Sequence, residues 1–334
     1  MGGRLPRRPR LRAVHPGRHR RHRGGAARPR PRDLTGPRGM AIGVAGLGRM
    51  GAAIAKRLLE TGHEVAVWNR SPEKAQPLAA LGARVAESPA ALAGAAEAVI
   101  TILTDSAAIE AVYGGPEGLL AGAKPGTLFI EMSTVRPEVE IALAARVAAA
   151  GGEFVECPVG GTVGPALQGK LLGLAGGEAG AVARARRILE ALCRRVEHIG
   201  PAGAGASMKL AINLPLVLYW QGLGEAMALV RHLGADPALL VDIFADSSGG
   251  SNALKSRAGV VAKVMAGESA GPATFDMDGM RKDLRTMIEE ARARGFGLPL
   301  AERALAVYDE ASAAGWGKVD GAEIPAFWAR HAKP

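Results

Sequence analysis

AIGVAGLGRMGAAIAKRLLETGHEVAVWNR, residues 41–70, contains an apolar run, a glycine-rich turn, a helical pattern and a second apolar run. This order predicts strand, loop, helix and strand. Each glycine of G-x-G-x-x-G has a physical use. Gly46 permits a tight turn, Gly48 lets the backbone approach a pyrophosphate, and Gly51 lets the helix pack closely on the strand. Because a helix N-terminus attracts phosphates, we expect a dinucleotide there. The predicted contacts are Gly46, Leu47, Gly48, Arg49, Met50 and Gly51.

The residues after the second apolar run indicate which dinucleotide binds. An NAD site usually has an acidic residue at this place, where it binds the ribose 2′-hydroxyl. This chain has Asn69, Arg70 and Ser71 instead. An arginine can bind a 2′-phosphate with two hydrogen bonds, whereas a carboxylate would repel it. We therefore predict NADP in preference to NAD. The alternative is that Arg70 is only solvated and that Ser71 begins the next helix.

Residues 1–39 differ from the rest of the chain. They contain 13 arginines and a single acidic residue, Asp33, and are predicted to be disordered because they have almost no periodic apolar pattern. Subtracting these charges from the totals of 42 basic and 32 acidic residues leaves 29 and 31, so the basic composition does not predict nucleic-acid binding by the remainder. The segment could be a nucleic-acid-binding arm, a targeting peptide, or upstream sequence joined to a protein that starts at Met40. We favour the start at Met40, because the first strand follows at once.

The cysteine content and the hydropathy pattern argue against a disulfide-rich, a metal-binding or a membrane-spanning protein. The two cysteines, Cys157 and Cys193, lack C-x-x-C spacing, which argues for a reducing compartment and against a disulfide scaffold or a metal site. We read Cys157 as a small buried apolar residue. No apolar run reaches the roughly 18 residues that a membrane span needs. A soluble, cytoplasmic protein without a bound metal is expected.

The remaining chain divides into two patterns. Up to residue 202, short apolar runs at 83–86, 98–103, 127–131, 154–157 and 171–175 alternate with helical patterns at 71–81, 89–93, 106–113, 137–150 and 179–193. This alternation predicts an α/β fold with a Rossmann-type, doubly wound parallel sheet over residues 40–202. A long helix at 207–233, with a kink expected at Pro215, then joins the sheet to an all-α second domain over 203–330.

The junction carries the residues that we expect to perform the chemistry. In the sequence GAGASMKLAIN, residues 203–213, Lys209 and Asn213 are four positions apart and so share one helix face. Lys209 has apolar neighbours, and burial lowers the pKa of a lysine until it can exchange protons near neutral pH. Such a group suits proton transfer to or from a carbinol oxygen, with Asn213 holding the lysine or the substrate.

Together with the glycine loop, these residues resemble the β-hydroxyacid dehydrogenases, which include 3-hydroxyisobutyrate dehydrogenases and the tartronate-semialdehyde and glyoxylate/succinic-semialdehyde reductases. The resemblance covers residues 41–330 in five ordered blocks, at 46–51, 131–137, 156–169, 203–213 and 281–284. It implies an NADP-dependent oxidoreductase that interconverts a small acid-bearing carbonyl compound and its hydroxyacid.

The resemblance also implies roles for individual residues. Lys209 would be the general acid/base and Asn213 its partner. Leu103, Thr104, Thr134 and Lys282 would contact the cofactor, and Ser133, Gly160, Gly161 and Thr162 the substrate. Thr134 could instead only cap a helix, and Lys282 only pair with an acid. The second domain implies a homodimer or homotetramer.

Two departures from the family pattern stand out. The chain has E-C-P-V-G-G-T at 156–162 where the family commonly has D-A-P-V-S-G-G, so Gly160 replaces a serine that helps to hold the substrate's acid group. The backbone of Gly160 and Gly161 could still bind an anion, and Thr162 could restore a hydroxyl. This version is similar to that of sulfolactaldehyde reductases. Thr104 stands where a proline is common.

The sequence is also compatible with two alternative functions. Imine reductases resemble this family but usually carry another residue in place of Lys209. A non-catalytic, nucleic-acid-associated member of the family would be expected to lose that lysine and to use the basic segment 1–39.

Overall fold

A computed structural model of the chain describes residues 41–331, which belong to one compact unit. The predictions for residues 1–39 therefore lie outside the described residues. The strands of the sheet are β1 Ile42–Ala45, β2 Val65–Trp68, β3 Arg84–Val85, β4 Ala98–Thr101, β5 Leu128–Glu131, β6 Glu153–Glu156, β7 Val159–Gly160, β8 Leu171–Gly177 and β9 Cys193–Gly200. Within the same part of the chain the helices are α1 Arg49–Glu60, η1 Pro72–Ala75, α2 Gln76–Ala79, α3 Pro89–Ala95, α4 Ser106–Tyr113, α5 Leu119–Gly122, α6 Pro137–Ala149, α7 Val163–Leu167 and α8 Ala179–Leu189.

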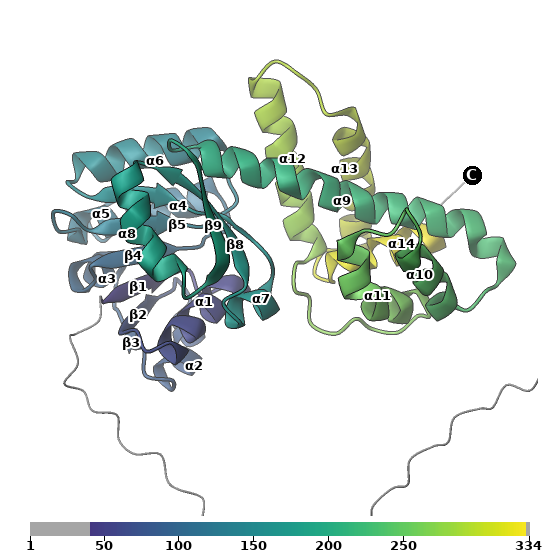
Figure 1. Cartoon of the computed structure of the whole chain (residues 1–334), viewed down its shortest axis with the longest axis horizontal. Helices are drawn as coiled ribbons and strands as arrows, with labels where there is room; N and C mark the ends of the chain where they lie inside the picture. Colours follow the sequence, from purple (N-terminus) through teal and green to yellow (C-terminus); the bar gives the residue numbers. More distant parts are fainter. Residues whose placement is uncertain (1–40, 332–334) are drawn as a thin grey trace, which may run out of the picture. The chain divides into compact units, whose positions relative to one another are not determined.

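The nine strands form one sheet in the order β3-β2-β1-β4-β5-β6-β8-β7, with β9 beside β8 (Figure 1). Strands β1 to β6 all run parallel to one another, so the doubly wound Rossmann-type fold is confirmed. The chain runs outward from β1 in one direction and from β4 in the other. Ligands bind at the carboxyl ends of strands where the order reverses. The switch point of this sheet lies between β1, which ends just before Gly46, and β4, which ends just before Leu103.

Both faces of the sheet are buried, and successive strand residues enter opposite cores. In β5, Leu128 and Ile130 pack in one core with α1 and α8, while Phe129 packs in the other with α3, α4 and α6. This period of two is what a sheet covered by helices on both faces requires.

The structure corrects three details of the sequence prediction. The helix expected over 71–81 is a 3₁₀ turn followed by the single turn α2, because Pro77 cannot donate the hydrogen bond that would continue the helix. The helix expected to reach Cys193 ends at Leu189, and Cys193 begins β9. Strands β7 and β9 were not predicted, and β8 is antiparallel to β6 and β7. The sequence of β9, CRRVEHIG, is largely polar because only β8 pairs with it, so it lacks the apolar run of a central strand.

The remainder of the described chain, up to His331, is helical, as predicted. Its elements are α9 Ala204–Val230, η2 Arg231–Leu233, α10 Pro237–Asp246, α11 Asn252–Met265, α12 Met277–Ala293, α13 Pro299–Ala311, η3 Ser312–Trp316, η4 Gly321–Glu323 and α14 Ile324–His331. The long helix α9 packs on β8 at one end and on α12, α13 and α14 further along (Figure 1). It is a single element that contains Pro215. These helices enclose their own apolar core, separate from the two cores of the sheet. The domain boundary between residues 202 and 203 stays a prediction.

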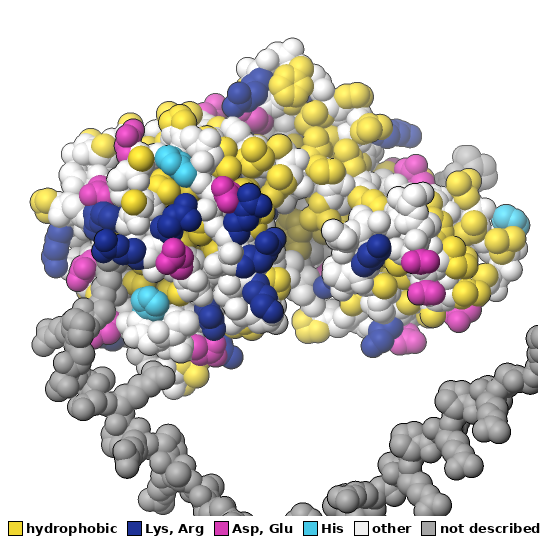
Figure 2. All heavy atoms as spheres, in the orientation of Figure 1, with side chains coloured by type: hydrophobic (Ala, Val, Ile, Leu, Met, Phe, Trp, Pro, Cys, Tyr) yellow, Lys and Arg dark blue, Asp and Glu magenta, His cyan; other side chains and the backbone are white. Residues whose placement is uncertain are grey.

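Charged side chains are interspersed on the visible surface, with Lys and Arg gathered over the sheet-containing part (Figure 2). Among the described residues, no helix combines the length and apolarity that crossing a membrane requires.

Candidate active site

The glycine loop has the backbone geometry that its sequence predicts. Gly46 has φ +93°, a left-handed conformation that favours glycine, and a side chain there would clash with the carbonyl oxygen of Ile102. A side chain at Gly51 would clash with the carbonyl oxygen of Gly46, which explains the close packing of α1. Gly48 instead faces open space, with no atom within 4 Å of a Cβ placed on it. Since no side chain caps α1, its first N–H groups can bind a phosphate, and the loop fits a dinucleotide.

Asn69 braces this loop from the end of β2. Its Oδ1 atom accepts a hydrogen bond from Leu47 N over 2.8 Å, and its Nδ2 atom donates to Ser71 O over 3.0 Å. Arg70 is exposed at the strand end, and Ser71 makes no side-chain capping bond. The sequence predicted these three residues as cofactor contacts, and the observed bonds give Asn69 a structural task as well.

A cavity of about 200 Å³ lies beside Asn69. Its walls include apolar side chains from two neighbouring strand ends and the turn between them, and Glu87 also lines it, whereas Arg70 does not. The apolar members of this group were not predicted as site residues, because in the sequence they look like ordinary core residues: Trp68, Pro72, Ala75, Val85 and Ala86. Their position at the ends of β2 and β3 makes them candidates for contacts to a flat apolar group such as the base of a dinucleotide.

The ends of β4 and β5 meet on the other side of the loop. Leu103 packs against Gly46, and Thr104 is exposed. The Ser133 hydroxyl accepts a hydrogen bond from Leu103 N over 2.7 Å and donates to Glu131, and Ser133 is only 1% exposed. The hydroxyl that was predicted to touch the substrate is therefore directed into the protein, and the structure does not bring it to Lys209.

Lys209 and Asn213 lie together on α9, as their spacing predicts. Lys209 Nζ donates to Asn213 Oδ1 over 2.9 Å, and both residues are less than 9% exposed. Asn213 Nδ2 in turn donates to Asp283 Oδ2 on α12 over 3.1 Å. Asp283 was not predicted as a site residue. The signal that could have found it is an acidic residue directly after Lys282 in a helix whose other buried positions are nearly all apolar.

Lys282 extends this network to the end of β5. Its ammonium group lies 2.7 Å from Asp283 Oδ1 and donates to the backbone oxygen of Thr134 over 2.6 Å. Thr134 is not the cap of α6, because that helix has Arg136 at its N-cap. The structure thus brings Lys209, Asn213, Lys282 and Thr134 together, with Asp283 between the two lysines.

The pKa of Lys209 falls from 10.5 to about 8, and burial is the main cause. The Asp283 carboxylate opposes this fall, whereas the positive charge of Lys282 contributes to it. A lysine in this state gains and loses a proton close to neutral pH, as general acid/base catalysis requires.

The predicted substrate loop approaches the same stretch of α9. A Cβ placed on Gly160 would lie 3.8 Å from Ile212 Cδ1, so the loop passes beside the helix turn between Lys209 and Asn213. Gly161 has φ +126°, which only glycine adopts readily. Thr162 is the N-cap residue of α7, but its side chain makes no capping bond, which leaves its hydroxyl available.

Glu156 fixes the start of α9. Its Oε1 atom accepts hydrogen bonds from Gly205 N over 2.6 Å and from Ala206 N over 3.2 Å, so a carboxylate occupies the positive end of the helix that carries Lys209. Complete burial raises the pKa of Glu156 to about 7. Glu156 was not predicted as a site residue, although it ends β6 and precedes the predicted substrate loop.

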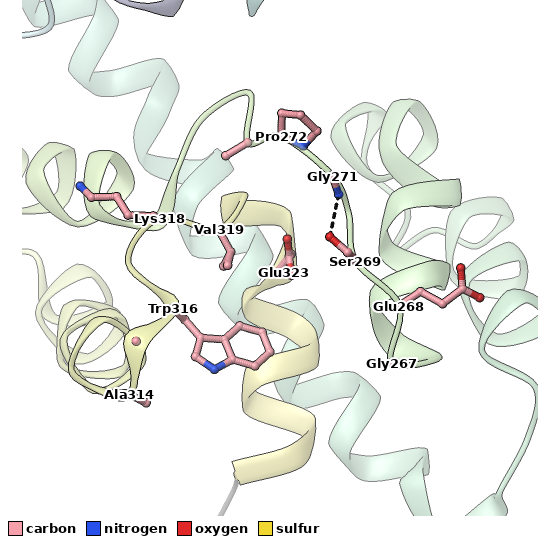
Figure 3. A pocket seen from close by; sticks show the side chains of 12 residues that line it. Gly267, Glu268, Ser269, Gly271, Pro272, Ala314, Trp316, Lys318, Val319 and Glu323 are labelled. Atoms are coloured by element: carbon pink, nitrogen blue, oxygen red, sulfur yellow. Dashed lines mark hydrogen bonds between the residues drawn. The ribbon is translucent and has the colours of Figure 1, made fainter.

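Three further features of the described residues concern a reactive cysteine, a metal site and a second cavity. Cys157 is fully buried and burial raises its pKa, which agrees with a packing role. Between residues 41 and 331, no group of three His, Cys, Asp or Glu side chains could hold a metal ion. A hollow of about 510 Å³ lies between the 267–273 loop and the Trp316–Val319 turn (Figure 3), and none of the predicted site residues lines it.

Comparisons with known proteins identify relatives of both parts of the chain. Residues 41–200 match the NAD binding domain of 6-phosphogluconate dehydrogenase, and residues 203–327 match the family described as NAD-binding of NADP-dependent 3-hydroxyisobutyrate dehydrogenase. The 3-hydroxyisobutyrate dehydrogenase of Pseudomonas aeruginosa is 37% identical over 264 residues, which cover 78% of this chain and 88% of that protein.

Solved structures give the same result. The crystal structure of 3-hydroxyisobutyrate dehydrogenase from Salmonella typhimurium is 28% identical, with a TM-score of 0.77, and the match covers 86% of this chain and 99% of that one. The structure of Psf3 in complex with NADP+ and 2-OPP is 30% identical, with a TM-score of 0.76, over 86% of this chain and 99% of that one.

Proposed function

We propose that this chain, which belongs to the β-hydroxyacid dehydrogenase family and is an NAD(P)-dependent dehydrogenase, interconverts a small acid-bearing aldehyde or ketone and its hydroxyacid. The observation that carries the proposal is the buried Lys209, which is hydrogen-bonded to Asn213, lies on the part of α9 that the 160–162 loop approaches, and has a pKa of about 8. The family membership confirms the resemblance that the sequence motifs predicted.

The chemistry of the protein groups follows from this arrangement. When bound, the dinucleotide supplies or accepts the hydride. Lys209 gives its proton to the oxygen of the substrate during reduction and takes it back during oxidation, so no free alkoxide forms. Asn213 orients Lys209 through its Oδ1 atom, and Asp283 in turn orients Asn213. Lys282 and Thr134 would lie at the nicotinamide end of the cofactor.

NADP is the proposed cofactor, in preference to NAD. The residue at the end of β2 is the exposed Arg70, and no carboxylate occupies that position. A guanidinium group there can bind the 2′-phosphate with two hydrogen bonds. The structure of Psf3, which was solved with NADP+, supports this choice, whereas a 35% identical relative from Pseudomonas aeruginosa is named NAD-dependent L-serine dehydrogenase.

We propose that the acid group of the substrate binds at the Gly160–Gly161–Thr162 turn. The positive φ of Gly161 lets consecutive backbone N–H groups point to one place, and the Thr162 hydroxyl is not used to cap α7. This turn borders α9 near Lys209, so one small molecule could reach both. The buried Ser133 hydroxyl would then not touch the substrate, and would instead hold the ends of β4 and β5 in place through its bonds to Leu103 and Glu131.

The experiment is a panel of small semialdehydes, glyoxylate and sulfolactaldehyde, assayed with NADPH and NADH, with cyclic imines beside them. We expect reduction of at least one anionic carbonyl compound and a loss of about 10²- to 10⁴-fold in kcat for Lys209→Ala, with the cofactor dissociation constant nearly unchanged. The control is Lys56→Ala, which removes a half-exposed lysine paired with Glu60. Activity of Lys209→Ala within a few-fold of wild type, or reduction of imines alone, would reject the proposal.

A homo-oligomer is also proposed, and the apolar surface of the helical part supports it. Leu229, Leu233, Leu239 and Ile243 each expose more than half of their surface. Light scattering of the purified protein would test this, and a monomer at all concentrations would contradict it.

A further inference from the structure

Arg49 makes an unexpected contact. It is the first residue of α1, inside the glycine loop, and the sequence predicts a cofactor contact for it. Its Nη1 atom donates to Ala273 O over 2.9 Å and its Nη2 atom donates to Asp276 Oδ2 over 2.9 Å. These two partners lie 224 and 227 residues further along the chain, directly before α12.

Asp276 makes a second hydrogen bond, which connects the contact with Arg49 to helix α12. Its Oδ1 atom accepts from Gly279 N over 2.9 Å and so caps α12. Helix α12 carries Lys282 and Asp283 less than two turns after this cap. A single carboxylate therefore links the glycine loop to the helix that supplies two of the groups around Lys209.

Several hydrogen bonds hold the segment around Asp276 in place, so a displacement of Asp276 would also displace the start of α12. Asp320 Oδ2 accepts from Thr274 N over 2.8 Å and from Thr274 Oγ1 over 2.9 Å, while Arg257 pairs with Asp320 Oδ1 over 2.6 Å. Asp276 and Asp320 also form an antiparallel bridge.

We propose that the Arg49–Asp276 pair couples dinucleotide binding at the glycine loop to the placement of α12, so that both are positioning residues for the proposed reaction. This inference rests on the proposed function. The guanidinium group has donors left over for a phosphate while it holds Ala273 and Asp276. Because the two side chains are 45% and 19% exposed, the pair should add little to stability, and its effect should appear in the site. Small displacements of Lys282 and Asp283 are sufficient, since a 1 Å error in a catalytic group can cost about 10²-fold in rate.

Asp276→Ser tests the coupling, because serine still caps a helix but is too short and uncharged to hold Arg49. Hydrogen exchange is the first measurement. In the wild-type protein, saturating NADP+ should slow exchange of the amides at 279–285 at least threefold, and in Asp276→Ser this response should be largely lost. Arg292→Met, which removes an exposed arginine of the same helix that pairs with Glu302 of α13, is the control and should keep the wild-type response.

Kinetics give an independent test. Asp276→Ser and Arg49→Met should each lower kcat about tenfold, and the double variant should be no slower than the slower single variant, because both remove one contact. An unchanged exchange response in Asp276→Ser, or effects on kcat that multiply, would overturn the coupling. A wild-type protein that binds neither NADP+ nor NAD+ would instead overturn the proposed function, and the coupling with it.

Discussion

Asn213 Nδ2 donates a hydrogen bond to Asp283 Oδ2 over 3.1 Å and so joins α9 to α12 across 70 residues of sequence. Asn213 also accepts from Lys209 Nζ, which means that the orientation of Lys209 depends on a carboxylate from another helix. The negative charge of Asp283 counteracts the effect of burial on the pKa of Lys209.

The first prediction concerns the pH dependence of the reaction. Reduction requires protonated Lys209, so its rate should be constant below the Lys209 pKa of about 8 and fall above it, and oxidation should show the opposite trend. Asp283→Asn removes the charge that raises this pKa, so the alkaline limb of reduction should move to lower pH. Asp309→Asn, which removes a half-exposed carboxylate on α13, should leave the limb in place. Profiles of kcat against pH check this, and a limb that moves to higher pH in Asp283→Asn would contradict it.

The second prediction concerns Glu156 and stability. The folded-state pKa of about 7 lies above the ordinary 4.5, so the folded chain binds this proton more tightly than the unfolded chain. The stability that Glu156 contributes is therefore fully present below pH 4.5 and is lost as pH rises through about 7. Glu156→Gln cannot titrate, and should reduce the fall in unfolding free energy between pH 5 and pH 8 by on the order of 1 to 3 kcal/mol.

Urea unfolding at the two pH values measures this difference. The control is Glu178→Gln, because Glu178 is exposed and makes no side-chain capping bond. Equal pH dependence in wild type and Glu156→Gln would show that Glu156 does not titrate in this range.

The third prediction separates two glycines of the loop. Gly51→Ala places a methyl group on the Gly46 carbonyl oxygen and should destabilise the protein by at least roughly 1 to 3 kcal/mol. Gly48→Ala meets no atom within 4 Å, so the folded protein should keep its stability. It should nevertheless bind the dinucleotide more weakly, since the methyl group occupies the space of the pyrophosphate. Thermal unfolding and cofactor titration of both variants check this. An unchanged cofactor affinity in Gly48→Ala would show that the pyrophosphate does not bind beside Gly48.

The fourth prediction concerns cofactor choice. Arg70→Asp should lower kcat/KM with NADPH at least tenfold and leave kcat/KM with NADH equal or higher, because a carboxylate repels the 2′-phosphate and can accept from a ribose hydroxyl. Arg195→Asp, a change at an exposed arginine of β9, is the control. Equal kcat/KM values for the two cofactors in the wild-type protein would remove the role proposed for Arg70.

The sequence by itself determined the fold and the first half of the site. The glycine spacing at residues 46–51, the alternation of apolar runs with helical patterns, and the four-residue interval between Lys209 and Asn213 are local features, and local backbone geometry converts them directly into structure. The prediction was less reliable where a proline interrupts a helix, as at residue 77, or where an edge strand is polar, as in β9.

Only the tertiary structure decided which distant groups surround Lys209. It brought Asp283 and Lys282 to Asn213 and Thr134, directed the Ser133 hydroxyl inward to Glu131, placed Glu156 at the start of α9, and turned Arg49 toward Asp276. No periodicity encodes these contacts. They depend on how α9 and α12 pack against the strand ends, and that packing is set by apolar cores whose residues are many positions apart in the chain.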